Sequence, residues 1–160
     1  MSLVVEDGAG LPDADSYVSV SDADSYAVAM GHVSWLATGV TEAQKETALR
    51  RATQYVDSRY RYKNSKLNPD QALEWPRVGF PWPVKRVTDA TCELAVRALS
   101  GALYADVAPE DNIKSETVGP LTTVYQDAEN GGQVRFAIVD DLLLPLVVSG
   151  QMTTIRLERA

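Results

Sequence analysis

The chain has 160 residues, of which 45% are hydrophobic, and a formal net charge of −7. This length and composition fit one domain with one core, since domains commonly run to roughly 100–200 residues. The acidic balance argues against non-specific binding to duplex DNA or to a membrane surface. The single cysteine, Cys92, excludes an internal disulfide and a multi-cysteine metal site. Its helical surroundings predict a buried, reduced thiol, which suits a cytosolic origin.

The charge is distributed unevenly along the chain. Residues 1–40 carry six acidic and no basic residues, residues 41–87 carry five acidic and ten basic residues, and residues 88–160 carry eleven acidic and five basic residues. The basic middle is either a solvated helix face or a surface that pairs with a neighbouring subunit. The N-terminal residues lack the basic and apolar regions of a signal peptide, and no run approaches the ~18 apolar residues of a transmembrane helix. We therefore expect no membrane partner.

The first half of the chain is expected to be helical after an extended arm. Residues 1–20 are expected to form that arm, with strand-like alternation over residues 16–20. Ser21 is expected to cap a short helix over residues 22–30 that Gly31 ends. Thr41 and Gln44 form a capping box that opens a helix running to about Tyr60. Apolar residues at three- and four-residue spacing predict one buried stripe on that helix: Ala48, Leu49, Ala52, Tyr55, Val56 and Tyr60.

The segment from Gln71 to Val87 is rich in proline and tryptophan. Its three prolines fix φ and remove backbone donors, so neither a helix nor a central strand is expected there. A loop this apolar must fold back on the core or cover a partner. In the first case its two tryptophans cap the end of the helical core, and in the second its exposed part meets another subunit. The candidate interface residues are Trp75, Arg77, Phe80, Trp82, Lys85 and Arg86.

The second half begins with another long helix, expected from about Val84 to Asp106. Its apolar face is rich in alanine, which favours close packing at the centre of a bundle. Residues 107–137 are expected to be a β-rich loop that bends at Gly119-Pro120, with residues 133–136 pairing back on it. A short apolar helix over residues 138–149 and a terminal arm or strand over residues 150–160 follow.

These elements predict a mainly α fold in a single domain over residues 1–160. The expected architecture is a small helical bundle built on two long helices within residues 21–106. Extended N- and C-terminal arms and a small β segment near residues 115–137 complete it.

No pattern of catalytic residues is recognisable. His32 is the only histidine and lies in a loop signal, which favours a surface or loop position without a catalytic role. The acidic pairs Asp13/Asp15 and Asp22/Asp24 do not follow the spacing of a calcium-binding loop. No phosphate-binding glycine motif occurs. We therefore expect no enzyme activity, no cofactor and no metal.

One segment interleaves aromatic and basic residues: Tyr55, Arg59, Tyr60, Arg61, Tyr62 and Lys63. Single-strand nucleic-acid sites combine stacking platforms with a basic groove, so this segment could bind a single strand. The alternative is an ordinary basic helix end, with Tyr55 and Tyr60 in the core.

Several segments, in order along nearly the whole chain, resemble the head-tail connector (adaptor) proteins of tailed bacteriophages. Part of that group is labelled DnaT-like single-stranded DNA-binding protein. The matching segments include residues 16–26, Trp35, residues 45–57, 71–77, 83–86, 93–99, 114–120 and 139–146.

The resemblance implies a non-catalytic virion protein of small helical fold with extended arms. Copies would form a ring, by implication a dodecamer in the virion, and the purified protein would be a monomer in solution. The ring would bind the portal protein on one side and a tail-completion or stopper protein on the other, with DNA as cargo through its channel. The protein would be found in the virion, and in the host cytoplasm during assembly. The alternative is a single-stranded DNA-binding module acting in phage replication, which the acidic net charge does not favour.

Overall fold

The computed structural model describes residues 2–104, 115–118, 121–124 and 135–148. The chain divides into two compact units: Met1–Leu103 with Phe136–Thr153, and Tyr104–Arg135 with Thr154–Ala160. Among the described residues, the helices lie in the first unit, which we call the core unit, and two paired strands lie in the second. A mainly helical fold is thereby confirmed. The predicted C-terminal arm lies outside the described residues.

Helix α1 spans Val20–Met30. Its N-cap is Ser19, whose hydroxyl accepts a hydrogen bond from the Asp22 amide, so the predicted cap at Ser21 was two residues late. Ser19 takes this role because its backbone is extended (φ −75°, ψ 160°), as an N-cap requires. Gly31 ends the helix as predicted, with a φ of 73° that a glycine adopts without strain.

Helix α2 spans Glu42–Arg59 and begins at the predicted capping box. The Thr41 hydroxyl accepts from the Gln44 amide, and the Gln44 side chain accepts from the Thr41 amide at 2.8 Å. The helix ends where Tyr60 becomes extended (φ −117°, ψ 149°). The predicted apolar stripe is confirmed, because all of its members are buried.

Helix α3 spans Lys85–Ser100 and ends earlier than the predicted Asp106. The guanidinium of Arg51 on α2 donates to the carbonyls of Ala98 and Gly101, at 2.9 and 3.0 Å. These bonds satisfy two carbonyls near the helix C-terminus, which would otherwise lack partners. The C-cap is Gly101, and the Arg51 bonds add a contact between helices that sequence periodicity does not report.

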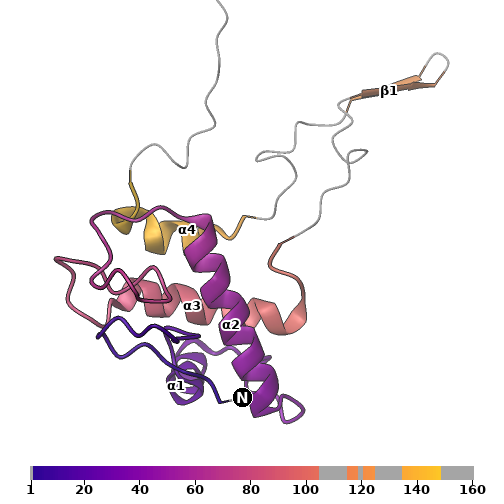
Figure 1. Cartoon of the computed structure of the whole chain (residues 1–160). Helices are drawn as coiled ribbons and strands as arrows, with labels where there is room; N and C mark the ends of the chain where they lie inside the picture. Colours follow the sequence, from indigo (N-terminus) through magenta and orange to yellow (C-terminus); the bar gives the residue numbers. More distant parts are fainter. Residues whose placement is uncertain (1, 105–114, 119–120, 125–134, 149–160) are drawn as a thin grey trace, which may run out of the picture. The chain divides into compact units, whose positions relative to one another are not determined.

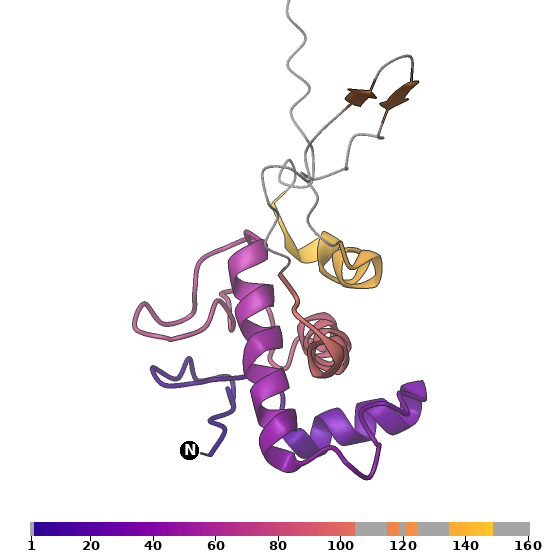
Figure 2. The same cartoon turned by 90° about the vertical axis from the view of Figure 1, so that its right-hand side faces the viewer.

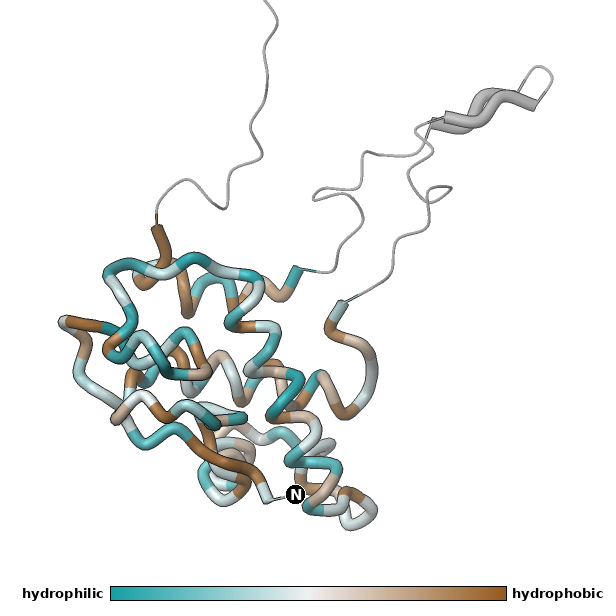
Figure 3. The backbone as a smooth tube through the Cα atoms, viewed as in Figure 1, coloured by the Kyte–Doolittle hydropathy of each residue, from teal (hydrophilic) through white to brown (hydrophobic). Residues whose placement is uncertain are grey.

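Helix α3 is the centre of the core unit, as its alanine-rich face predicts. It packs against α1, α2 and α4. In Figure 1 α2 crosses α3, and in Figure 2 α3 is seen nearly end-on, with α4 on one side of it and α1 on the other. The tube in Figure 3 shows hydrophobic and hydrophilic residues mixed along α2 and α3, as expected for helices with one buried face.

The predicted helix over residues 138–149 is shorter than expected. Helix α4 spans Ala137–Leu143, and the 3₁₀ helix η2 spans Leu144–Leu146. Pro145 explains the change, because its ring and missing N–H are incompatible with the middle of an α-helix. Residues 146–148 then pair with residues 61–63: the Lys63 amide donates to the Leu146 carbonyl and the Val148 amide to the Arg61 carbonyl, both at 2.9 Å.

The second unit contains strands β1 (Ser115–Val118) and β2 (Leu121–Val124). They pair antiparallel, with Val118 opposite Leu121. The predicted β segment is therefore present on both sides of Gly119-Pro120, which itself lies outside the described residues. The predicted pairing of residues 133–136 with this segment is not found for its described half, because residues 135 and 136 form no strand and Phe136 is the N-cap of the helix that follows. Residues 133 and 134 lie outside the described residues.

The N-terminal segment is part of the core unit and packs into it. Val5 forms a parallel bridge with Ser16, and Ala14, Tyr17 and Val18 are buried. The predicted strand over residues 16–20 is limited to this bridge, because α1 already begins at Val20. In the part of the chain that the structure describes, no helix combines the length and apolarity needed to cross a membrane.

Candidate functional site

The apolar segment 71–87 is covered by the N-terminal residues of the same chain. The Ala72 amide donates to the Leu11 carbonyl at 2.9 Å, and the Trp75 amide donates to the Tyr17 hydroxyl at 3.1 Å. Gly8 lies over the Trp82 ring so closely that an added Cβ would stand 2.6 Å from Trp82 Cδ1. Of the two alternatives for this segment, folding back on the core is therefore the one observed for most of it.

Trp75 is a core residue. Its side chain is fully buried and makes edge-to-face contacts with Tyr62 and Phe80, at centroid distances of 5.2 and 5.1 Å. Such ring pairs add to the stabilisation that burial of the aromatic surface provides. Trp75 cannot reach a partner unless the core opens.

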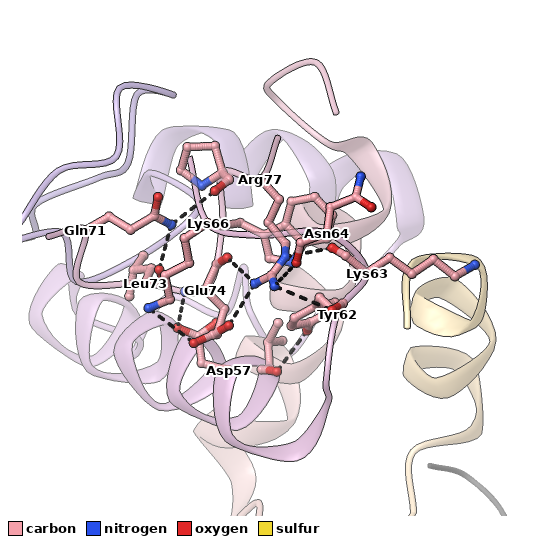
Figure 4. Close-up of polar contacts among 12 residues, drawn as sticks. Asp57, Tyr62, Lys63, Asn64, Lys66, Gln71, Leu73, Glu74 and Arg77 are labelled. Atoms are coloured by element: carbon pink, nitrogen blue, oxygen red, sulfur yellow. Dashed lines mark hydrogen bonds and ion pairs between the residues drawn. The ribbon is translucent and has the colours of Figure 1, made fainter. Parts of the chain in front are cut away.

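Arg77 is also buried, at 8% exposure, and its guanidinium is saturated by groups of its own chain. Nε donates to the Lys63 carbonyl at 2.8 Å, and Nη1 donates to the carbonyl and carboxylate of Glu74 at 3.0 and 2.8 Å. Nη2 donates to the carbonyls of Tyr62 and Asn64. Figure 4 shows these bonds converging on the guanidinium between two stretches of backbone. Arg77 therefore holds residues 62–64 in place instead of offering its charge to a ligand.

Asp57 forms a second, half-buried polar centre beside this one (Figure 4). Its carboxylate accepts from the Tyr17 hydroxyl and from the Glu74 amide, the latter at 3.1 Å. Burial raises the pKa of Asp57 to about 6, against the lowering effect of these two hydrogen bonds. Lys66 pairs with Glu74 at 3.2 Å. Together these contacts connect the N-terminal segment, α2 and the 71–87 segment.

The structure does not bring the six predicted interface residues to one accessible surface. Trp75 and Arg77 are internal, while Phe80 and Trp82 are half-buried. Lys85 and Arg86 are exposed in the first turn of α3. Lys85 pairs with Asp89 at 2.6 Å, and Arg86 donates to the Leu142 carbonyl at 3.4 Å. As an interface, the predicted set is therefore reduced to its half-buried and exposed members.

The interleaved aromatic and basic segment separates into two faces. Tyr60 and Tyr62 are buried, and their hydroxyls donate to Asp140 at 2.6 Å and to the Val56 carbonyl at 2.9 Å. Burial raises the pKa of both tyrosines, so both hydroxyls stay protonated. Arg61 and Lys63 are exposed instead. The segment presents cations to solvent, while its tyrosines are not available as a stacking platform.

One polar cluster was not foreseen from the sequence. Glu93, only 2% exposed, accepts from Tyr26 (3.0 Å), His32 (3.0 Å) and Arg97 (2.6 Å). Burial alone would raise the pKa of Glu93, but the hydrogen bonds from Arg97, His32 and Tyr26 outweigh it and hold the pKa below its usual value. The spacing of four residues between Glu93 and Arg97 was the available signal for one of these contacts. His32 thus ties the loop after α1 to α3.

Over residues 2–104 and the shorter described segments, no three His, Cys, Asp or Glu side chains lie together as a metal site would need. The buried acids named above all have donors from the same chain.

Residues 1–160 match the family described as "Putative DnaT-like ssDNA binding protein". The chain belongs to this family. No curated protein and no solved structure matches it. This description agrees with the label "DnaT-like single-stranded DNA-binding protein", which part of the head-tail connector group carries. The match to this DnaT-like family supports the single-strand-binding alternative better than the head-tail connector, which stays a prediction.

Proposed function

We propose that the protein is a binding module for single-stranded DNA whose contact surface is the basic segment at the end of α2. The family match over the whole chain carries this proposal. The segment supports it through its charge: residues 58–69 contain Arg59, Arg61, Lys63 and Lys66 and no acidic residue. This local charge is opposite to the net charge of −7.

The phosphate backbone is the target that such a segment recognises. Arg61 and Lys63 are exposed, and the Lys63 ammonium is positioned by the Pro145 carbonyl at 2.8 Å. The backbone between them is fixed by its pairing with residues 146–148 and by Arg77. A fixed backbone reduces the ordering cost of binding. With the tyrosines buried, affinity is expected to depend mainly on charge and therefore on salt.

The test is fluorescence anisotropy with a labelled oligo-dT strand at several NaCl concentrations. We expect micromolar binding at low salt, with log K falling against log [NaCl] with a slope of roughly −1.5 to −3, since each neutralised phosphate contributes about −0.7. Arg61→Glu should weaken binding and make the slope shallower. Lys85→Glu, which changes an 81% exposed lysine elsewhere, is the matched control and should have a smaller effect. Absence of binding at low salt would refute the proposal.

A second candidate is the ring-forming adaptor that the head-tail connector resemblance implies. The observation that favours it is an apolar knob, formed by Val28, Met30, Val33 and Leu36, which are 66%, 54%, 80% and 42% exposed. Residues 28–41 contain no Asp, Glu, Lys or Arg, which suits contact with protein more than with DNA.

The knob is built on a fixed backbone. Trp35 is buried, and its Nε1 donates to Asp24 at 2.6 Å, while His32 is held by Glu93. The anchored inner residues leave the apolar side chains outside, as in a preorganised protein interface.

In a phage that encodes this protein, deletion of its gene should then give DNA-filled or leaking heads without tails. Val33→Asp should reproduce that defect without lowering the melting temperature of the purified protein. Normal tailed particles from the deletion would rule this candidate out.

A further inference from the structure

A short β ribbon follows the basic segment and presents apolar side chains to solvent. Lys66 and Arg77 form an antiparallel bridge, and the Leu67 and Val78 amides donate to the Pro76 and Ser65 carbonyls, at 3.1 and 3.0 Å. In an antiparallel pair, residues that stand opposite each other share one face, and that face alternates along the strand. Arg77 is buried at the bridge, whereas its neighbour Val78 is exposed.

The outward face carries two large aliphatic side chains that serve no core. Leu67 is 50% and Val78 is 48% exposed. Phe80 follows Val78 by two residues and is half-buried, with its ring packed edge-to-face on Trp75. We call Leu67, Val78 and Phe80 the apolar rim. Exposed aliphatic residues that are scattered need no explanation, but these lie on one small ribbon.

The ribbon holds the apolar rim in one geometry. The Asn64 side chain donates to the Val78 carbonyl at 2.8 Å, and the Asn64 carbonyl accepts from Arg77. Asn64 itself has a φ of 62°, which asparagine tolerates better than most residues. These contacts fix the apolar rim before any ligand arrives.

The apolar rim is directly continuous with the proposed phosphate contacts. The Val78 amide donates to the Ser65 carbonyl at 3.0 Å, and Ser65 is two residues from Lys63, so the backbone stretch that carries Lys63 adjoins the one that carries Val78. Cations beside a solvent-facing apolar strip match a single strand, which offers phosphates on one side and unpaired bases on the other. A duplex hides its base faces and could use only the cations.

We propose that the bases of a bound single strand pack on the apolar rim while Arg61 and Lys63 contact its phosphates. This inference rests on the proposed single-strand binding and adds a second, uncharged contribution to it. A protein segment docking on the same rim is the competing occupant. The run of cations without an acidic residue over residues 58–69 favours the polyanion.

The test compares an oligo-dT strand with an abasic deoxyribose-phosphate strand of the same length. We expect the wild-type protein to bind the abasic strand roughly tenfold more weakly, because that strand has no apolar base surface to bury on the apolar rim. The double variant Leu67→Ser/Val78→Ser should lose most of this discrimination and keep the salt slope. Phe80→Leu should lose part of it. Arg61→Glu should change the slope and keep the discrimination.

The matched control is Val28→Ser/Val33→Ser, which removes two exposed valines from the apolar knob and should leave both strands bound as by the wild type. Equal wild-type affinity for the two strands would overturn this inference and leave the proposed function standing. Discrimination that survives in the Leu67/Val78 variant would overturn it as well. If that variant also loses self-association, the rim would be a contact between protein copies instead. No binding of either strand would overturn the proposed function together with it.

Discussion

The two faces of the ribbon at residues 64–67 and 76–79 have the same backbone but different roles. The inner face carries Arg77, which is saturated by five acceptors of its own chain. The outer face carries Leu67 and Val78, each about half exposed. Residue type alone would predict the opposite arrangement, with the cation exposed and the aliphatic residues buried. The comparison teaches that hydrogen-bond saturation, not charge, decides which residues are left for a partner.

The largest effect should come from the aromatic core beneath the inner face. Trp75→Ala should lower the free energy of unfolding by roughly 3–5 kcal/mol, because it leaves a cavity beside Tyr62 and Phe80. Urea unfolding followed by circular dichroism measures it. Trp82→Ala, a half-buried position, is the control and should cost less. A Trp75 variant as stable as the wild type would show that the segment is not part of the core.

Arg77→Met should cost about 3 kcal/mol, since it leaves buried carbonyls of residues 62–64 without their donor and leaves Glu74 with Lys66 as its remaining cationic partner. Arg77→Lys should restore only part of this loss, because an ammonium cannot match the planar fork of the guanidinium. Thermal unfolding of the three proteins gives the ranking. If the lysine variant equals the wild type, charge alone is what the site needs.

Local signals explain which parts of the fold were predictable. The Thr41–Gln44 capping box and the α2 stripe depend on residues close in sequence, and both were confirmed. The end of α3 was placed too late although Gly101 follows the helix in the sequence, whereas the bonds from Arg51 to carbonyls about fifty residues away were not predictable. The length of α4 was misjudged although Pro145 was visible.

The candidate site shows the same limit more sharply. The sequence marks Arg77 as a basic residue in an exposed-looking loop, but its partners are mostly backbone carbonyls, which have no signature in the sequence. The burial of Tyr60 was expected from the α2 stripe and was confirmed, whereas Leu67 and Val78 were not singled out. Whether a ribbon residue points inward depends on register, and a shift by one position would reverse it.

The next largest effect is a pH dependence of the free energy of unfolding that comes from Asp57, which accepts a hydrogen bond from the Glu74 amide. Its pKa is about 6 in the folded protein, above the usual value of 3.8. The folded state therefore holds this proton more tightly, so the contribution of Asp57 to stability is greatest below pH 4 and is lost as the pH rises through 6. The loss should amount to roughly 2–3 kcal/mol, from about 1.4 kcal/mol per unit of pKa.

Urea unfolding at pH 4, 5, 6 and 7 measures this slope. In Asp57→Asn the slope between pH 4 and 6 should be much shallower than in the wild type, because the titrating group is gone. Asp70→Asn, which changes an exposed acid of the same type, should leave the slope unchanged. A wild-type slope that persists in Asp57→Asn would assign the pH dependence to another carboxyl.

The smallest effect on stability is expected at Val78, and that small effect is what separates the two faces. Val78→Ser removes an aliphatic group that is already 48% exposed and leaves the Val78 backbone bonds to Ser65 and Asn64 in place. The free energy of unfolding should change by no more than about 0.5 kcal/mol, as for most surface substitutions. A loss comparable with that of Arg77→Met would mean that the outer face also serves the fold. In that case a binding defect at Val78 could not be assigned to contact with a ligand.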